Sequence, residues 1–210
     1  MLAVAGGKGG VGKTTTALAL AATLARRRSP VRVVDTDCDM PDLHTMAGCA
    51  RQPTLSAVLD GDRVPDQPVP SLSGVRVVPA PTAAVKTSVA DALVALAARD
   101  SCQTVVDTPG GAGPEAVTPL RAVDSVLLVS DATPQSLSDC AKTAAMAREL
   151  DARVVGVVLT ATTTLPDGVS DLLDAPVLTA VPPARRPLDE AGVWAAYAEA
   201  TQRLSRHTVI

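Results

Sequence analysis

A glycine-rich loop near the N-terminus has the residue types and spacing needed to hold phosphate groups. Residues 7–14 read Gly-x-x-x-x-Gly-Lys-Thr, between a short apolar run and a helix-like stretch rich in Ala and Leu. Glycines let backbone N–H groups point at phosphate oxygens, and a helix N-terminus adds partial positive charge. In this motif the lysine, here Lys13, reaches the β- and γ-phosphates, and the hydroxyl of Thr14 binds Mg²⁺. A glycine-rich turn that merely opens a helix is the alternative, and the flanking strand and helix weigh against it.

Carboxylates follow two of the apolar runs. Asp35 comes directly after Val31–Val34 and Asp37 two residues later, and Asp107 comes directly after Thr104–Val106. Carboxylates at the carboxyl ends of strands, opposite a phosphate loop, can bind Mg²⁺ or position an attacking water. The alternative is that they are ordinary polar residues at the exits of strands.

Short Val-rich runs and helix-like stretches alternate along the chain, which predicts an α/β fold. The expected strands are Leu2–Ala5, Val31–Val34, Val75–Val78, Thr104–Val106, Val126–Val129, Val154–Leu159 and Val177–Val181. The expected helices are Thr14–Arg28, Ser88–Arg99, Pro134–Leu150, Gly168–Leu173 and Pro187–Arg206. Nearly continuous apolar strands suit a mostly parallel sheet with helices on both faces. We expect a single domain over residues 1–210, with Asp60–Ser73 as a surface loop.

Composition limits the classes of protein that remain. The formal net charge of −3 gives no overall attraction to nucleic acid. The four cysteines stand apart without a Cys-x-x-Cys pair, which argues against a disulfide framework or a metal cage. No run approaches the ~20 apolar residues of a membrane span, and nothing resembling an export signal precedes the glycine loop. We therefore expect a cytoplasmic protein.

The loop resembles the deviant phosphate loop of the ParA/MinD family of ATPases, because residues 6–15 carry a second lysine, Lys8. The resemblance implies ATP and Mg²⁺ as ligands, and a homodimer with ATP sandwiched at its interface. Lys8 would cross that interface and contact the nucleotide of the partner subunit. The nucleotide-binding residues that it implies in this loop are Gly7, Lys8, Gly9, Gly10, Val11, Gly12, Lys13, Thr14 and Thr15.

Two further segments resemble the switch elements of that family. In residues 33–43, Asp37 would position or deprotonate the attacking water, and Asp35 would support the strand end and the Mg²⁺ shell. In residues 104–111, Asp107 would hold the metal and Gly110 would contact the γ-phosphate. The resemblance thus implies Lys8, Lys13 and Asp37 as catalytic residues, and Thr14, Asp35 and Asp107 as metal ligands. Asp42 stands where the family often has Asn.

The resemblance continues to about Gly192. Residues 131–139 resemble the family's Thr-Pro segment that opens a helix, and residues 180–187 resemble its proline-containing loop beside the base, with Pro182 in that role. Thr160 stands where family members usually place an Asn that reads the base. Adenine selectivity is therefore expected by analogy.

The leading interpretation is an ATPase that acts as a dimerisation switch: it binds Mg·ATP, dimerises, engages an unidentified partner or surface, and is released by hydrolysis. The alternatives are an ATP-dependent metabolic enzyme resembling dethiobiotin synthetase, and a nucleotide-binding module with little turnover. The sequence names neither the cargo nor the activating partner.

The sequence also bears on contacts with a membrane and with DNA. The C-terminal stripe of Trp194, Tyr197, Thr201 and Leu204 is thin, so we expect it to cover the protein's own fold and not to anchor a membrane. The clusters Arg26–Arg28, Arg185–Arg186 and Arg203/Arg206 could contact DNA. Since cations complement helix C-termini, a helix-end role is favoured for Arg26–Arg28.

Overall fold

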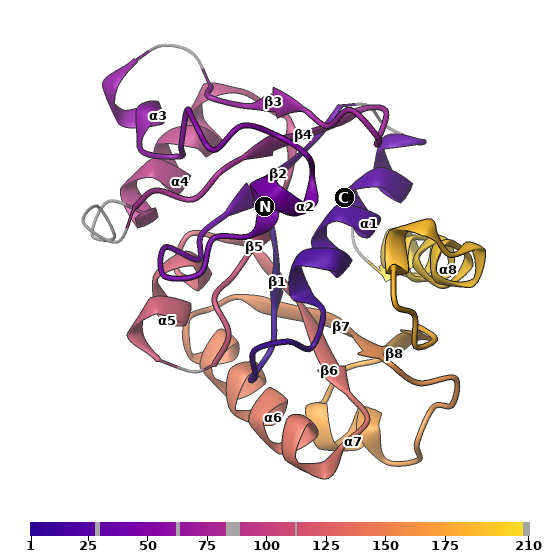
Figure 1. The fold of residues 1–210 in the computed structure, drawn as a ribbon. Coiled ribbons are helices and arrows are strands. Elements are labelled where there is room, and N and C mark those ends of the chain that lie inside the picture. The colour runs from indigo at the N-terminus through magenta and orange to yellow at the C-terminus, as the bar shows by residue number, and fades with distance from the viewer. Residues whose placement is uncertain (28–29, 62–63, 83–88, 112, 208–210) are drawn as a thin grey trace.

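The chain forms one eight-stranded sheet with helices on both faces (Figure 1). The structure is a computed structural model and describes residues 1–27, 30–61, 64–82, 89–111 and 113–207. The strand order is β3-β4-β2-β5-β1-β6-β7-β8, and among these described strands only β3 runs antiparallel to its neighbour. The strands are β1 (Leu2–Ala5), β2 (Val31–Asp35), β3 (Gln67–Pro68), β4 (Val75–Val78), β5 (Gln103–Asp107), β6 (Ser125–Asp131), β7 (Arg153–Thr160) and β8 (Val177–Ala180).

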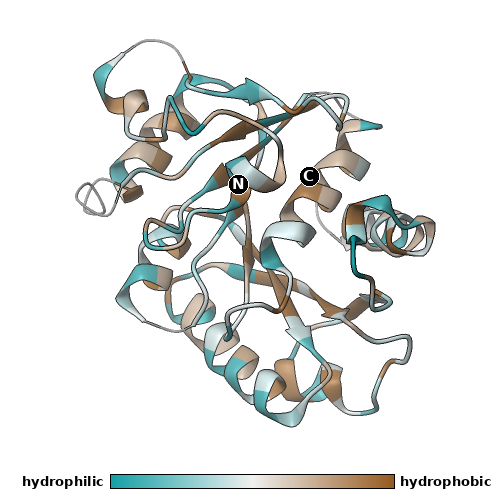
Figure 2. Ribbon diagram, viewed as in Figure 1, coloured by the Kyte–Doolittle hydropathy of each residue, from teal (hydrophilic) through white to brown (hydrophobic). Residues whose placement is uncertain are grey.

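Alternate strand residues pack on opposite faces of this sheet, which makes two cores. Val33 belongs to the core under α1, α2 and α8, whereas its neighbour Val34 belongs to the core under the helices from α3 to α7. Figure 2 shows the strands as the most hydrophobic part of the ribbon. The helices are α1 (Lys13–Ala25), α2 (Leu43–Met46), α3 (Ala57–Asp60), α4 (Val89–Arg99), α5 (Pro114–Leu120), α6 (Pro134–Glu149), α7 (Val169–Leu173) and α8 (Ala191–His207).

The predicted single-domain, mostly parallel α/β fold is confirmed, with seven strands at the predicted places. The predictions missed α2, α3 and α5, since short helices show little periodicity, although the five-residue α7 was found within the predicted Gly168–Leu173. The predicted helix Pro187–Arg206 is in fact a 3₁₀ turn, Pro187–Asp189, followed by α8. Ser88, the predicted start of α4, lies outside the described residues.

The C-terminal helix lies against the helix that follows the phosphate loop. The hydroxyls of Tyr197 and Thr16 are 2.8 Å apart, and Thr201 of α8 bonds Thr23 of α1. Tyr197 and Leu204 are buried, and burial raises the pKa of Tyr197 to about 12. The prediction that this stripe covers the protein's own fold is confirmed. Among the described residues, no helix is long and apolar enough to cross a membrane.

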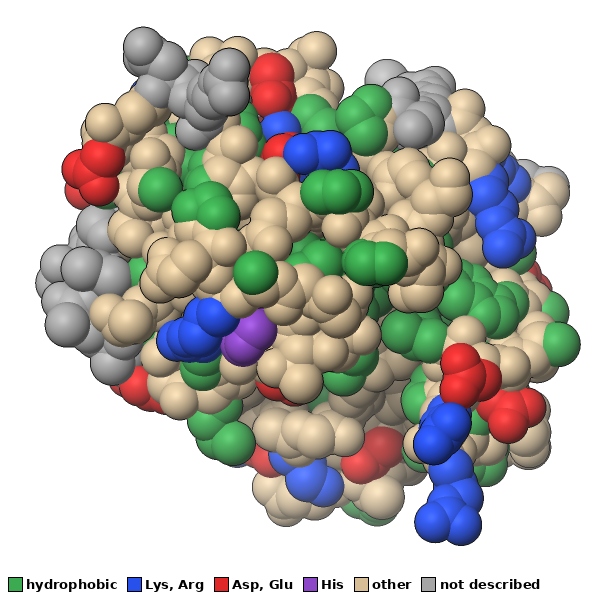
Figure 3. Space-filling view, turned by 45° about the horizontal axis from the view of Figure 1, so that its top comes forward, with side chains coloured by type: hydrophobic (Ala, Val, Ile, Leu, Met, Phe, Trp, Pro, Cys, Tyr) green, Lys and Arg blue, Asp and Glu red, His purple; other side chains and the backbone are tan. Residues whose placement is uncertain are grey.

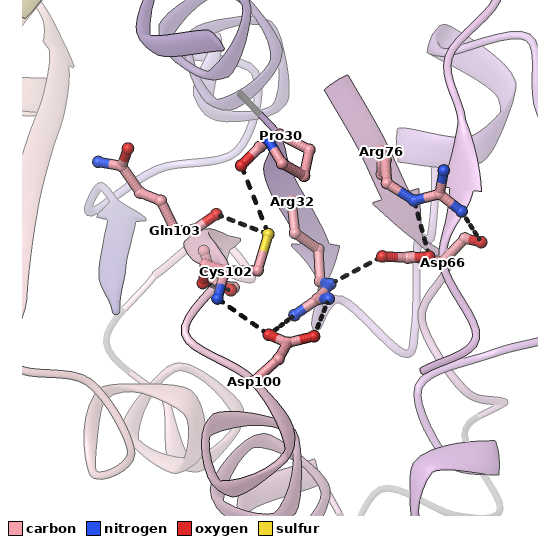
Figure 4. Close-up of polar contacts among 8 residues, drawn as sticks. Pro30, Arg32, Asp66, Arg76, Asp100, Cys102 and Gln103 are labelled. Atoms are coloured by element: carbon pink, nitrogen blue, oxygen red, sulfur yellow. Dashed lines mark hydrogen bonds and ion pairs between the residues drawn. The ribbon is translucent and has the colours of Figure 1, made fainter. Parts of the chain in front are cut away.

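A buried arginine joins the amino-terminal ends of the strands, far from the phosphate loop (Figure 4). Arg32 of β2 donates to Asp66 at 3.1 Å and to both oxygens of Asp100 at 3.1 and 2.8 Å. Arg76 of β4 also donates to Asp66, at 2.8 Å. The prediction that Asp60–Ser73 is only a surface loop is therefore wrong: it contains β3 and supplies Asp66 to this cluster. The three prolines of this segment led to the prediction of a loop. Proline is tolerated on an edge strand such as β3, so its presence does not exclude a strand there.

Candidate functional site

The phosphate loop joins β1 to α1, and its glycines are required by conformation and by close packing. Gly10 and Gly12 have φ of 77° and 89°, the left-handed region that favours glycine. At Gly7 the constraint is space, because a Cβ would lie 2.2 Å from the backbone carbonyl carbon of Asp139 in α6. The loop is thus held against α6, and its backbone can approach a ligand closely.

The two lysines of the loop have different surroundings. Lys13 is buried, with 8% of its surface exposed, and its Nζ donates to the backbone oxygen of Lys8 at 3.2 Å. Burial lowers the pKa of Lys13, while the charges of Asp107, Asp37 and Asp42 oppose that shift. The side chain of Lys8 is 49% exposed, and its Nζ lies 3.7 Å from Oδ2 of Asp131. Lys13 can therefore hold a phosphate within the subunit, whereas Lys8 lies at the rim of the loop.

The acids at the ends of β2 and β5 lie side by side. Asp35 and Asp107 are paired in the register of the two strands and are 1% and 3% exposed. Burial raises the pKa of Asp107 to about 7 and that of Asp35 well above its usual value, and in Asp35 the charge of Asp107 adds to the rise. Among the described residues, none donates a hydrogen bond to Asp35 Oδ2 or Asp107 Oδ1. Buried carboxylate oxygens that lack a partner fit a divalent cation, which would satisfy them.

The described side chains do not by themselves enclose a cation. Across the described ranges, no group of three or more His, Cys, Asp or Glu side chains is placed to hold a metal. A Mg²⁺ ion in a phosphate-loop site takes much of its coordination from the nucleotide and water. Thr14, Asp35 and Asp107 therefore fit Mg²⁺ as part of a Mg·nucleotide complex.

Asp37 and Asp42 lie on the segment that follows β2. Asp37 Oδ1 accepts hydrogen bonds from the backbone N–H groups of Asp39 and Met40, at 3.2 and 2.9 Å. The Asp37 N–H in turn donates to Asp35 Oδ1 at 2.9 Å. Asp42 accepts a hydrogen bond from the Thr14 hydroxyl at 3.1 Å. This segment therefore contacts both the strand end and the start of α1.

The segment after β5 closes over the phosphate loop. A Cβ at Gly110 would lie 3.0 Å from the Gly9 nitrogen and 3.2 Å from Nζ of Lys13, so a side chain there would crowd the loop. The Gly111 N–H donates to the Gly6 oxygen at 3.2 Å. Thr36 Oγ1 donates to the backbone oxygen of Asp107 at 2.7 Å, which links the two acidic segments. Sequence reasoning missed Thr36, because a backbone acceptor in another strand leaves no signal in the sequence.

The two residues predicted to border the base lie at the ends of β7 and β8. Thr160 is 9% exposed, and its hydroxyl donates to the backbone oxygens of Val11 at 2.8 Å and Ser130 at 3.3 Å. Pro182 is half-buried two residues after β8. Thr160 therefore stabilises the phosphate loop through the Val11 carbonyl.

The remaining loop residue, Thr15, is half-buried, and its hydroxyl lies 3.8 Å from the sulfur of Met46.

Basic side chains are dispersed. On the face shown in Figure 3, Lys and Arg form several separate groups, some beside acidic side chains. Arg26 lies over the Trp194 ring, 5.8 Å from its centroid, and Arg27 donates to Ser205 at 3.5 Å. Arg203 donates to Glu199 at 2.8 Å. Arg28 and the Arg206 side chain lie outside the described residues. Arg26, Arg27 and Arg203 thus have partners within the protein.

Comparison with known proteins identifies relatives of this chain. Residues 1–165 match the family model described as ParA, NUBPL iron-transfer P-loop NTPase. An uncharacterized ATP-binding protein of Methanocaldococcus jannaschii is 30% identical over 193 residues, which cover 86% of this chain and 73% of the relative. The antiactivator FleN of Pseudomonas aeruginosa is 33% identical over 148 residues, 66% of this chain but only 53% of FleN.

Solved structures have the same fold. The cell division ATPase MinD of Pyrococcus furiosus superposes with a TM-score of 0.84 at 20% identity, over 99% of this chain and 98% of MinD. MinD of Pyrococcus horikoshii, complexed with Mg-ADP, superposes with a TM-score of 0.84 at 19% identity, over 98% of this chain and 95% of that one. At this identity the likeness concerns the fold alone, and the family match rests on the sequence. The chain belongs to the ParA/MinD family of P-loop ATPases.

Proposed function

We propose that the protein is an ATPase that works as a nucleotide-dependent dimerisation switch. It binds Mg·ATP in the loop of residues 7–15, dimerises with ATP at the interface, engages a protein partner or a surface, and is released by hydrolysis. The observation that carries this proposal is the convergence, at one edge of the sheet, of a buried Lys13, an exposed Lys8 and the strand-end acids. The family match and the MinD relative with Mg-ADP support ATP and Mg²⁺ as ligands.

Each group has a distinct task in the proposed reaction. Lys13 and the backbone N–H groups of the loop bind the phosphates within one subunit. Thr14, Asp107 and Asp35 would hold Mg²⁺, which would supply positive charge to offset the negative charge that develops as the γ-phosphate is transferred. Asp37, whose Oδ1 is fixed by two backbone N–H groups, positions or deprotonates the attacking water. Lys8 of the partner subunit adds a cation next to the same phosphates.

The competing proposal is a metabolic enzyme in which the phosphate is transferred to a small molecule. A pocket of about 170 Å³ next to Asp37, bordered by Cys38, Val89 and Pro109, is the place where such a substrate would bind. Ligand pockets usually measure roughly 300–1,000 Å³. This small size favours water as the acceptor and therefore the switch.

Light scattering after size-exclusion chromatography tests the proposal, with ATP, with ADP and without nucleotide. We expect a dimer with Mg·ATP and a monomer in the other two samples. Phosphate release is then measured with Mg²⁺ or EDTA and without any added small molecule. A protein that stays monomeric with ATP, or that releases phosphate only when a small acceptor is added, would contradict the switch.

A further inference from the structure

The structure leaves one acid of the site without an assigned role. Asp42 is the N-cap residue of α2, the position at which an aspartate usually accepts a hydrogen bond from its own helix. Its side chain makes no such bond, and its Oδ1 instead accepts the proton of the Thr14 hydroxyl at 3.1 Å. The carboxylate is thus directed toward the phosphate loop at the expense of capping its own helix.

We propose that Asp42 is a further positioning residue of the Mg²⁺ site, and that it makes nucleotide binding by this protein unusually dependent on the divalent cation. This inference rests on the proposed binding of Mg·nucleotide. A hydroxyl that donates its proton to Asp42 keeps its oxygen lone pairs for a metal ion. Asp42 therefore orients Thr14 for the metal, and its formal negative charge stands beside the cation and the phosphates.

A second observation supports a cation at this place. Asp35 Oδ2 and Asp107 Oδ1 are buried, in side chains that are 1% and 3% exposed, and no described residue donates a hydrogen bond to them. The two carboxylates are paired at the ends of neighbouring strands, and the segment that carries Asp42 is joined to them by the hydrogen bond from the Asp37 N–H to Asp35 Oδ1. A divalent cation there would supply the partner that these two oxygens lack.

The charge of Asp42 has opposite effects on two binding constants. Without a metal, a carboxylate beside Thr14 repels the phosphates of the nucleotide. With the metal present, the same carboxylate attracts the cation and holds the hydroxyl in the orientation that the cation needs. At short range and intermediate dielectric, one charge changes each affinity by roughly tenfold. Asp42→Asn keeps the size and a carbonyl acceptor but loses the charge, so it separates these effects from simple loss of structure.

The test is a titration of the full chain with fluorescently labelled ADP, once in EDTA and once over a range of Mg²⁺ concentrations. We expect Asp42→Asn to bind metal-free ADP more tightly than the wild type, and to need roughly tenfold more Mg²⁺ to reach saturation. Asp42→Glu keeps the charge and should retain weak metal-free binding. Asp91→Asn, which removes the same formal charge from an exposed position on α4, should match the wild type in both conditions.

The outcomes separate this inference from the proposed function. The inference is overturned if Asp42→Asn matches the wild type both in its affinity for metal-free ADP and in the Mg²⁺ concentration that it needs. It is also overturned if the variant loses ADP affinity by the same factor with and without metal. The proposed function then still stands on wild-type binding. If the wild type itself binds no Mg·ADP, the proposed function fails and this inference fails with it. Thermal unfolding of each variant verifies that it folds.

Discussion

Lys8 Nζ lies 3.7 Å from Asp131 Oδ2, so within one subunit the lysine that would cross the interface rests on the end of β6. This ion pair is partly exposed, with the Lys8 side chain at 49% and Asp131 at 24%, and such pairs contribute only ~0–1 kcal/mol to stability. Lys8 can therefore leave Asp131 at little cost when a partner subunit offers phosphate oxygens.

Replacing this lysine should separate nucleotide binding from dimerisation. We expect Lys8→Ala to bind Mg·ATP with nearly wild-type affinity, since Lys13, Thr14 and the loop amides remain. The ATP-dependent dimer should be absent in light scattering. Lys142→Ala, which removes another exposed lysine paired with an aspartate, is the control and should dimerise normally. A Lys8→Ala protein that dimerises and hydrolyses ATP like the wild type would contradict the sandwich arrangement.

Asp37 should be needed for turnover and not for assembly. We expect Asp37→Asn to form an ATP dimer that persists, while phosphate release falls by roughly 10²-fold, the scale for loss of a general base. Asparagine keeps the Oδ1 that accepts from Asp39 and Met40, so the local loop is retained. Asp60→Asn, an exposed change on α3, should leave the rate unchanged. Normal hydrolysis by Asp37→Asn would exclude this carboxylate as the base.

The metal-free protein should lose stability as the pH rises. Asp107 has a pKa of about 7 when folded and 3.8 as its usual value, so the folded state binds more protons between these values. Its contribution to folding is therefore least unfavourable below about pH 4 and most unfavourable above about pH 7. In EDTA, we expect the Tm of the wild type to fall between pH 5 and 8 relative to that of Asp107→Asn. Parallel Tm curves for the two proteins would show that Asp107 is not the cause.

Thr160 should support the binding of phosphate without selecting the base. Thr160→Val leaves the Val11 carbonyl without its 2.8 Å donor, a loss of about 1 kcal/mol, or roughly fivefold in affinity. We expect Mg·ATP and Mg·GTP to weaken by the same factor, with ATP still preferred over GTP. Thr160→Ser keeps the hydroxyl and should restore both affinities. Competition with labelled nucleotides measures this, and a changed ratio of ATP to GTP would show that Thr160 reads the base.

The cluster around Arg32 should contribute to stability and not to the site. Arg32→Met leaves Asp66 with Arg76 and leaves Asp100, whose side chain is 39% exposed, without this partner. We expect the free energy of unfolding to fall by about 1–3 kcal/mol, the scale for hydrogen bonds to charged groups. Urea unfolding should show this loss, while affinity for Mg·ADP in the folded variant stays unchanged. Arg153→Met, an exposed change on β7, is the control. A stability equal to that of the wild type would mean that the aspartates find other partners.

The fold and most of the site could be predicted from the sequence because they depend on local patterns. Buried parallel strands are continuous apolar runs, and β1, β2 and β5 were recognised in this way. The glycine spacing of residues 7–14 is likewise fixed by the geometry of one loop, and Asp35 and Asp107 were found because parallel strands bring their carboxyl ends to one edge.

Only the tertiary structure decided which partner each polar side chain takes. Asp42 lies 28 residues from Thr14, and Thr160 lies 149 residues from Val11, so neither hydrogen bond leaves a periodic pattern in the sequence. Gly7 is a further case, since a side chain there would collide with the backbone of Asp139 in α6. Such contacts follow from the packing of elements distant in sequence. Local propensity therefore located the site, and long-range packing determined the part that each residue takes in it.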